Sequence, residues 1–537
     1  MTVLDEAIEL FMAGRLEEAR RACRKALRER PDLAEGHMLL AEIQRRSGDE
    51  ARARESTARV LRLRPGWSEA HIHVAIADLL ADFGRHDEAA SGYRRALELE
   101  PGLSDARYNL AAALFAAGRV PDSITELRSL LEREPGAADA REQLVRRLKD
   151  LRRFGELEPV CRDGMKLHPQ SPLYPNALGI ALWWSGKHDD AIAAFRISAE
   201  RAGQPESDAY QDARLAEASS LLALGRYAEG WQAYRWRHPR AALRKAHPEL
   251  VSDPGEVAAL REPKRIRVLS EQGFGDDLFF LRFAVALRRR GHRLGMVCDA
   301  KLAAVLAGMP ELFDSVNDAG SEADFTLCSG DLPLASAQSF APPLALPVDA
   351  ARRSAFEARL RRFGPPPYVG VTWRAGLFAD EPKPQRGAYL IKEAPLEALA
   401  ETLRPIDARV VVLQRRPVAA ELARFAGALG REVLDLSQVN DQLEDALAVL
   451  SLLDEYVGVS NTNMHLRAGL RGKSARVLLR MPAEWRWALD GPLSPWFPDF
   501  RLYRRSPDGD WSPALAELQE GLDAAMQQDT VGNPQRR

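Results

Sequence analysis

The sequence has few cysteines, no long apolar run and almost no net charge. Its 537 residues include four cysteines, which lie far apart and form no C-x-x-C pair. A disulfide framework and a cysteine-rich zinc site are therefore excluded. No apolar run approaches the length of a membrane span, and the first residues carry acids where a signal peptide has basic ones. We expect a cytoplasmic protein without a membrane span.

The charge balance and the absence of metal motifs exclude further classes. The formal charge is −2, so the chain has no basic field and nucleic acid is not an expected partner. It contains neither H-E-x-x-H nor a carboxylate cluster, which predicts chemistry without a metal or cofactor. Hydrophobic residues make up 46% and charged residues 28%, as in soluble globular proteins. The length of 537 residues is enough for two or three domains.

The first part of the chain is repetitive. Prolines recur at intervals of 34 or 36 residues, at Pro31, Pro65, Pro101, Pro135, Pro169 and Pro205. Glycines follow the same period, at Gly14, Gly48, Gly84, Gly118, Gly186 and Gly225, and Arg152 occupies the position of a missing one. Apolar residues between these positions have helical spacing. The repeating unit is therefore a helix, a tight glycine turn, a second helix and a turn that ends at proline.

These units resemble tetratricopeptide repeats, and about seven of them occupy residues 1–237. Alanines such as Ala41, Ala77 and Ala111 stand where small side chains allow two helices to pack closely. The resemblance implies an α-solenoid whose concave groove binds a protein partner. Asn109 matches the asparagine that grips a peptide backbone in some relatives.

The second part predicts parallel α/β architecture. After a linker at 238–263, short β-branched runs such as "RIRVLS", "YVGVTW" and "EYVGVS" alternate with helices. A proline-rich stretch divides this part into two Rossmann-like halves, 264–364 and 365–526, which face a cleft. Residues 527–537 are expected to be a disordered tail.

The stretch "SEQGFGDDLFFLRFA" at 270–284 has three interpretations. Asp276 or Asp277 caps a helix after a glycine turn, or the stretch is a dinucleotide fingerprint, or one aspartate is a general base beyond the first strand. Leu278 stands where the fingerprint needs its third glycine, and adjacent acids repel a pyrophosphate. These two features disfavour a nicotinamide enzyme.

The order of several motifs resembles glycosyltransferases of the lipopolysaccharide heptosyltransferase type, which have the GT-B fold (glycosyltransferase family 9-like). The resemblance is greatest to a bacterial group with tetratricopeptide repeats in front of such a domain. The motifs are "EGWQAYRWR", "EQGFGDDLFFLRF", "VGVTW", "KEAPLEAL", "YVGVSNTNMHLRAGLRG" and "EWRWALDGPLSPWFPDFRLYRR". Together with the repeats, the resemblance covers nearly the whole chain.

The resemblance assigns roles to residues on both halves. It makes Asp276 the base that deprotonates the acceptor, in a loop that also contains Gly273, Gly275 and Asp277. It makes Lys392 the cation that neutralises the leaving diphosphate. A surface lysine without a ligand is the alternative for Lys392.

The segment "SNTNMHL" predicts a phosphate site at a strand end. Ser460, Asn461 and Thr462 supply donors, and His465 contacts phosphate or ribose. The alternative is a capped helix with a half-buried histidine. Ser460 and Asn461 replace an aspartate and a threonine of the family, which puts the type of donor in question. Arg374 is a further candidate for a phosphate contact.

Together with the absence of metal motifs, the resemblance implies a metal-independent glycosyltransferase that acts on a protein. The donor is a nucleotide sugar, and the acceptor is a bacterial protein, such as a flagellar or surface protein, that the repeats recruit. The alternative is a tetratricopeptide scaffold with a transferase-like domain that does not catalyse.

Overall fold

The computed structural model describes residues 2–246, 251–318, 322–375, 392–480 and 483–532. The chain forms two compact units, Met1–Arg201 and Ala202–Arg537. No described helix is both long and apolar enough to cross a membrane.

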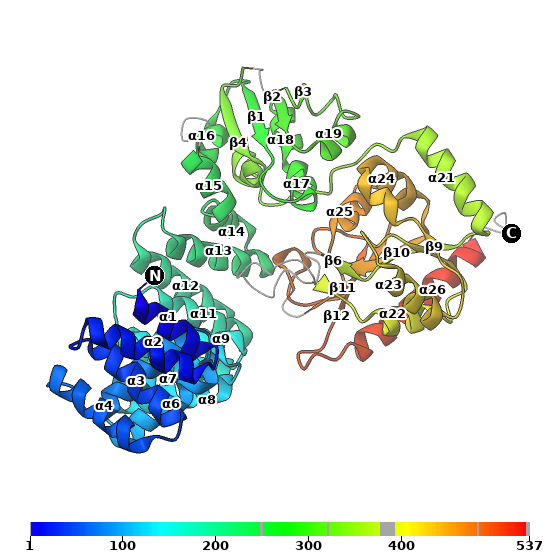
Figure 1. Ribbon diagram of the computed structural model, residues 1–537. Helices are drawn as coiled ribbons and strands as arrows, with labels where there is room; N and C mark the ends of the chain where they lie inside the picture. Colours follow the sequence, from blue (N-terminus) through cyan, green and yellow to red (C-terminus); the bar gives the residue numbers. More distant parts are fainter. Residues whose placement is uncertain (1, 247–250, 319–321, 376–391, 481–482, 533–537) are drawn as a thin grey trace. The chain divides into compact units, whose positions relative to one another are not determined.

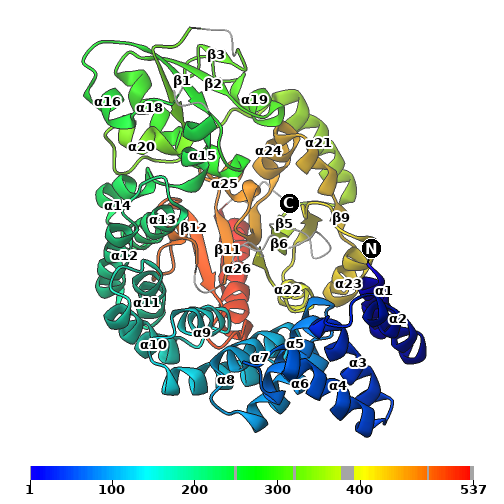
Figure 2. The ribbon, with the colours of Figure 1, turned by 60° about the vertical axis from the view of Figure 1, so that its left-hand side comes forward.

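Unit 1 consists of antiparallel helix pairs stacked in sequence order (Figures 1 and 2). Its helices are α1 (Val3–Met12), α2 (Leu16–Glu29), α3 (Ala34–Arg46), α4 (Glu50–Leu63), α5 (Glu69–Asp82), α6 (His86–Leu99), α7 (Ser104–Ala116), α8 (Val120–Arg133), α9 (Ala138–Asp150), α10 (Phe154–Leu167), α11 (Leu173–Trp184) and α12 (His188–Ala202). The predicted tetratricopeptide-like solenoid is confirmed.

The turn inside each pair has a left-handed residue. Gly84 and Gly118, for example, have φ values of 74° and 77°, a conformation that glycine adopts without steric cost. Arg152, at the position of the missing glycine, has φ 56°, so the turn geometry persists although a side chain makes it less favourable. The predicted small residues Ala77 and Ala111 are fully buried between helices.

Four further helices open unit 2. They are α13 (Asp208–Ala223), α14 (Tyr227–Tyr234), α15 (His238–Ala246) and α16 (Pro254–Ala259). The sequence predicted that the array ends at 237, but α13 and α14 belong to the compact unit of the sheets. The reason is aromatic packing, because the Trp231 ring on α14 lies within 5.4–6.1 Å of the rings of Phe280, Trp485 and Trp496. The predicted linker is also partly helical.

The first sheet is parallel, with strand order β3-β2-β1-β4. Its strands are β1 (Arg265–Leu269), β2 (Arg293–Val297), β3 (Ser315–Val316) and β4 (Phe325–Cys328). The helical segments of this half are α17 (Phe274–Phe280), η1 (Leu281–Phe283), α18 (Ala284–Arg289), α19 (Ala300–Leu306), η2 (Ser329–Asp331) and α20 (Leu332–Ala335). The chain leaves β1 in one direction and returns to its other side at β4, so a topological switch point lies between them.

The second sheet is also parallel, with order β12-β11-β10-β5-β8-β9. Its strands are β5 (Tyr368–Thr372), β8 (Arg409–Val412), β9 (Leu434–Asp435), β10 (Glu455–Val459), β11 (Ala475–Leu479) and β12 (Phe500–Arg504). Its central strands β5, β10 and β11 are buried at every residue, which explains their mainly apolar sequences; the two charged residues, Glu455 and Arg476, pair with each other. The switch point of this sheet lies between β5 and β10.

Helices cover the second sheet, and a short hairpin stands beside it. The helical segments are α21 (Ala350–Phe363), α22 (Leu396–Leu403), α23 (Ala419–Leu429), η4 (Ser437–Asp441), α24 (Leu443–Leu452), α25 (Thr462–Ala468), η5 (Trp485–Trp487) and α26 (Ser512–Gly532). Strands β6 (Arg374–Ala375) and β7 (Lys392–Glu393) pair antiparallel.

Two predicted boundaries in this half differ from the structure. Helix α21 was predicted to end the first half, but it packs on α24 of the second, where Arg352 pairs with Asp445. Helix α26 continues to Gly532, so the predicted disorder from residue 527 is wrong as far as 532. Leu518 and Leu522 explain this helix, since both are buried in the core of the second sheet. Residues 533–537 lie outside the described residues.

Candidate functional site

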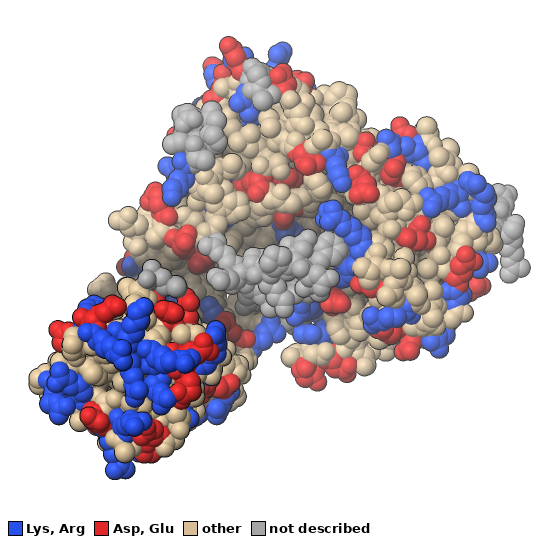
Figure 3. Space-filling view, viewed as in Figure 1, with Lys and Arg blue, Asp and Glu red and all other residues tan. Residues whose placement is uncertain are grey.

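A cavity of about 320 Å³ lies where the carboxyl ends of the two sheets meet in unit 2. Figure 3 shows a hollow in this unit with Lys and Arg side chains along one side. The lining comes from segments that follow β1, β5, β8, β10 and β11, and from β7. Both switch points therefore open into one space, which is where parallel α/β sheets bind ligands.

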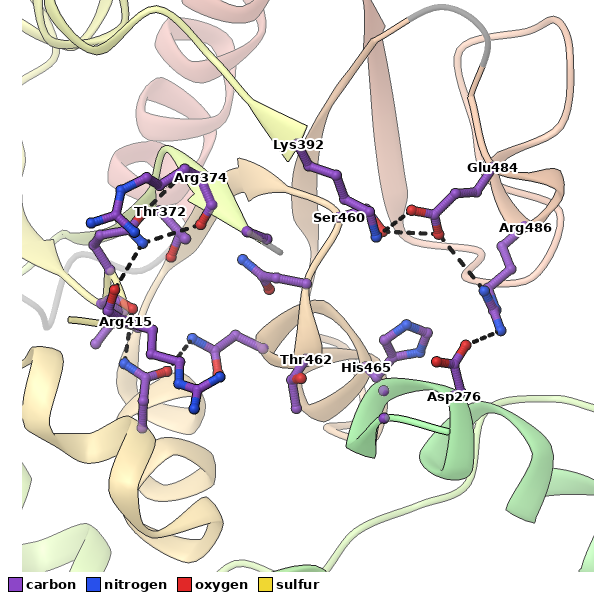
Figure 4. Close-up of a pocket in the computed structure, with 18 residues that line it drawn as sticks. Asp276, Thr372, Arg374, Lys392, Arg415, Ser460, Thr462, His465, Glu484 and Arg486 are labelled. Carbon is purple, nitrogen blue, oxygen red and sulfur yellow. Dashed lines mark hydrogen bonds and ion pairs between the residues drawn. The ribbon is translucent and has the colours of Figure 1, made fainter. Parts of the chain in front are cut away.

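Asp276 lines this cavity from the third position of α17. The helix begins at Phe274, with Gly273 as its N-cap and no side-chain cap. The interpretation of Asp276 or Asp277 as the capping residue is therefore wrong, because Gly275 already has helical geometry. The Asp276 carboxylate forms an ion pair with Arg486, which stands after β11 (Figure 4).

Asp277 faces away from the cavity. It is 1% exposed, and its carboxylate accepts hydrogen bonds from Ser270 and, at 2.6 Å, from Ser329. Burial raises the pKa of Asp277 to about 6, although the two serine hydroxyls oppose the shift. Of the two adjacent acids, only Asp276 can meet a ligand in the cavity.

Gly275 allows the two halves to approach each other. A Cβ at this position would lie 2.8 Å from Cδ2 and 3.2 Å from Nε2 of His465, which is closer than carbon atoms pack. His465 belongs to α25, which packs on α17. The second glycine of the "GFGDD" motif is thus explained by close packing and not by a phosphate.

His465 is buried beside several cations. Burial and the charges of Arg486, Arg282 and Lys392 hold its pKa well below the ordinary value, so the imidazole is neutral. Its Nδ1 atom is buried without a hydrogen-bond partner among the described residues. Arg282 is itself buried among aromatic rings and donates to the carbonyl of Trp496 at 3.1 Å. Burial lowers the pKa of Arg282 to about 9.

Lys392 and Ser460, which the sequence analysis assigned to a phosphate site, lie together on the other wall (Figure 4); their binding of phosphate stays a prediction. Both contact Glu484: Lys392 as an ion pair, and Ser460 through its hydroxyl at 3.4 Å. Glu484 is in turn 3.7 Å from Arg486. A continuous chain of charges therefore links Lys392 to Asp276.

Asn461 has a structural role in this segment. Its Oδ1 accepts the backbone N–H of Met464 at 3.1 Å, which caps α25, and its side chain also bonds the Tyr456 hydroxyl at 3.2 Å. The alternative of a helix cap is thus correct for this residue. Thr462, the next residue, is half-buried and lines the cavity.

Arg374 lines the cavity but is engaged by protein groups. It donates to Glu421 at 2.8 and 2.9 Å and to the carbonyl of Arg416 at 3.0 Å. Gln414 holds the backbone here, because its Oε1 accepts the N–H groups of Trp373 and Arg374. Arg415 is exposed on the same wall, and its guanidinium makes no ion pair among the described residues.

Several lining residues were not predicted from the sequence, notably Thr372, Gln414, Arg415, Asn440, Glu484 and Arg486. Glu484 and Arg486 lie in "EWRW", where tryptophans drew attention to packing. Trp485 and Trp487 are indeed buried. The signal that was missed is the pair of opposite charges alternating with them, because a buried charge needs a nearby partner.

Buried ion pairs hold the loop that precedes Asp276. Arg237 donates to Glu271 at 2.7 and 2.9 Å and to Asp331 at 2.9 Å, and Arg240 also pairs with Asp331. Gln272 donates to the Tyr234 hydroxyl at 3.0 Å. The motifs "YRWR" and "EQG" are therefore physically joined, and the helices before the sheets help to position the loop.

Asn109, the predicted peptide contact, lies in unit 1 on α7. It donates to Asp78 at 3.1 Å, and Asp78 also accepts from the Tyr93 hydroxyl at 2.5 Å. The role of Asn109 in peptide binding stays a prediction.

Comparison with known proteins supports the repeats. The family described as tetratricopeptide repeat matches residues 10–75 and 80–148. Among solved structures, MamA covers 34% of this chain and 97% of its own at 18% identity, with a TM-score of 0.31. PilF of Pseudomonas aeruginosa covers 39% and 94% at 17% identity, with a TM-score of 0.25.

A curated relative extends beyond the repeats. Protein FlbA of Caulobacter vibrioides is 26% identical over 364 residues, which cover 63% of this chain and 59% of FlbA. The chain thus spans less than two thirds of that protein. Since 63% of the chain exceeds the share occupied by the predicted array, the similarity continues into the part that contains the sheets.

Proposed function

We propose that the repeats recruit a protein partner and that the cleft of unit 2 transfers a sugar to it from a nucleotide sugar. Stacked tetratricopeptide repeats are protein-binding modules, which supports a recruiting role for the N-terminal part. The observation that carries the enzymatic part is the cavity at the carboxyl ends of both sheets. In this cavity, a chain of ion pairs connects Asp276 of the first half to Lys392 of the second half.

The charge of the cavity favours a diphosphate. Among the described residues, four cations line it, Arg374, Lys392, Arg415 and Arg486, against the two acids Asp276 and Glu484. Positive side chains and hydroxyl donors stabilise the charge that develops on a departing diphosphate. The diphosphate would contact Lys392, Arg415, Ser460 and Thr462. In this proposal, these residues stabilise the leaving group without a metal ion.

Asp276 would act as the base. The acceptor hydroxyl gives its proton to the Asp276 carboxylate as its oxygen bonds to the anomeric carbon. The bond from that carbon to the diphosphate breaks, and the cations receive the leaving group. A GT-B arrangement of two halves around the cleft is part of this proposal.

Transfer from a panel of nucleotide sugars tests the proposal. We expect Asp276→Asn to reduce transfer at least about 100-fold, as for loss of a general base, while nucleotide binding remains. Asp299→Asn is the matched control, because Asp299 caps α19 outside the cavity and asparagine caps equally well. Unchanged transfer by Asp276→Asn overturns the assignment of the base.

A scaffold without catalysis is the second candidate. It is favoured by the ion pairs that engage both Asp276 and Lys392, and by the repeats, which account for partner binding without an enzyme. A thermal shift separates the two proposals. A nucleotide sugar at 100 times its Kd stabilises an enzyme by about 2.7 kcal/mol, whereas a scaffold melts at the same temperature with every donor in the panel.

A further inference from the structure

The carboxylate of Glu484 lies inside a ring of donors. The residue precedes η5 and lines the cavity. Lys392 forms an ion pair with it, the Ser460 hydroxyl donates at 3.4 Å, and Arg486 approaches to 3.7 Å (Figure 4). The carboxylate of Glu484 is thus surrounded by an ammonium, a hydroxyl and a guanidinium group. The same three kinds of donor bind phosphate oxygens.

This carboxylate is ionised. Burial alone raises the pKa of Glu484, but the charges of Lys392 and Arg486 outweigh it and lower the pKa below the ordinary value. Glu484 is also the acid that pairs with Lys392 among the described residues. The free protein therefore carries its own anion at the point where the cavity is most cationic.

The backbone beside Glu484 is anchored. Trp485 and Trp487 are buried on either side of Arg486, and the Trp485 ring lies 5.1 Å from that of Phe279 and 5.4 Å from that of Trp231. Arg486 remains paired with Asp276. Rotation of the Glu484 side chain alone therefore suffices to release Lys392 and Ser460.

We propose that Glu484 occupies a phosphate subsite in the free protein and that a diphosphate ligand displaces it from Lys392. The ligand class rests on the proposed function. After displacement, Arg486 still offers the carboxylate a partner, while the phosphate takes Lys392 and Ser460. Glu484 is thus a specificity residue, because only a ligand that brings its own negative charge can compensate Lys392 for the loss of its partner.

Inorganic pyrophosphate is the probe, and its affinity is measured by calorimetry on the full chain. Glu484→Gln removes the competing charge but keeps an oxygen for Ser460. We expect pyrophosphate to bind at least about fivefold more tightly to this variant, as for loss of one charge within a few ångströms of the ligand. We expect the double variant Lys392→Ala/Glu484→Gln to lose this gain in affinity for pyrophosphate.

Glu393→Gln is the matched control. Glu393 is exposed and follows Lys392 directly, so its substitution changes the net charge equally without emptying the subsite. The proposal is overturned if Glu484→Gln binds pyrophosphate no more tightly than Glu393→Gln, or if neither variant binds it at millimolar concentration. Pyrophosphate contains no sugar and no nucleoside, so a gain in Glu484→Gln supports the subsite even if every transfer assay is negative.

Discussion

Charged residues are used differently in the two units. In unit 1, ion pairs recur at the start of the second helix of a pair and link residues three positions apart, as in Arg15–Glu18 and Arg119–Asp122, with exposed side chains. In unit 2, Arg237 pairs with Glu271, 34 positions away, and with Asp331, 94 positions away. The side chains of these three residues are at most 1% exposed. The exposed pairs of unit 1 recur with the repeat period, whereas the buried pairs of unit 2 link elements that are distant in the sequence.

The difference has energetic and functional consequences. Exposed pairs contribute little, since water competes for both partners. A buried charge that loses its partner costs several kcal/mol. A buried pair in unit 2 holds the loop of Asp276, and partly exposed pairs connect Asp276 to Lys392 through Arg486 and Glu484. In unit 1, charged residues therefore pair at helix starts and between neighbouring helices, whereas in unit 2 they also determine the geometry of the site.

Removal of a buried cation should have the largest effect. We expect Arg237→Leu to lower the free energy of unfolding of unit 2 by about 3–5 kcal/mol, because Glu271 is left buried without this cation. Arg119→Leu, at an exposed pair of unit 1, should cost at most about 1 kcal/mol. Urea unfolding followed by tryptophan fluorescence measures both. Equal losses would contradict the comparison.

Asp277 should make the stability of unit 2 depend on pH. Its pKa is about 6 in the folded protein against an ordinary 3.8, so the folded state binds the proton more readily and stability falls as the pH rises from 4 through 6. Asp277→Asn removes this dependence. At pH 8 the variant should be more stable than the wild type by up to about 3 kcal/mol, at 1.36 kcal/mol per pKa unit. Unfolding curves at pH 4 and 8 test this; a gain of the same size at both pH values would refute burial of the charge as its cause.

Two helical glycines distinguish close packing from open surface. Gly275→Ala places a methyl group against His465 and should cost about 1–3 kcal/mol, as overpacking does. Gly155→Ala in α10 meets nothing within 4 Å and should stabilise unit 1 by up to about 1 kcal/mol. Thermal unfolding of each variant measures these two changes in stability. Stabilisation by Gly275→Ala would show that α17 and α25 do not pack so closely.

The smallest effect concerns Asn109. Asn109→Ala removes one of two hydrogen bonds to Asp78, and we expect a loss of about 1 kcal/mol from unit 1. Ser91→Ala on α6 is a control, since among the described residues its hydroxyl donates to a carbonyl of the same helix, that of Asp87. If Asn109→Ala leaves the unfolding curve unchanged, Asn109 is free to serve a partner instead.

Local patterns made most of the fold predictable. The proline and glycine periods located the helix pairs, and β-branched runs located β1, β5, β8, β10 and β11. Strand β12, "FRLYR", was missed because it lies in a segment rich in tryptophan, which was interpreted as packing only. Its neighbour β11 supplies the backbone partners that make it a strand, and sequence spacing does not contain that information.

The site was predictable only in part. The predicted residues that do line one cavity are Gly273, Gly275, Asp276, Arg374, Lys392, Ser460, Asn461, Thr462 and His465, whereas Asp277 does not. The start of α17 was misjudged because aspartate is a good N-cap, whereas in the structure the helix begins two residues before Asp276, with Gly273 as its N-cap. Glu484 and Arg486 were missed because the partners Lys392 and Asp276 lie 92 and 210 positions away.

Binding of nucleoside diphosphates to the full chain tests the central claim most directly. Calorimetry with the diphosphates of adenosine, guanosine, uridine and cytidine should find at least one that binds. Lys392→Ala should weaken it about tenfold or more, equivalent to about 1.4 kcal/mol, and Glu393→Gln should not. If none of the four binds at millimolar concentration, the cleft is not a nucleotide-sugar site.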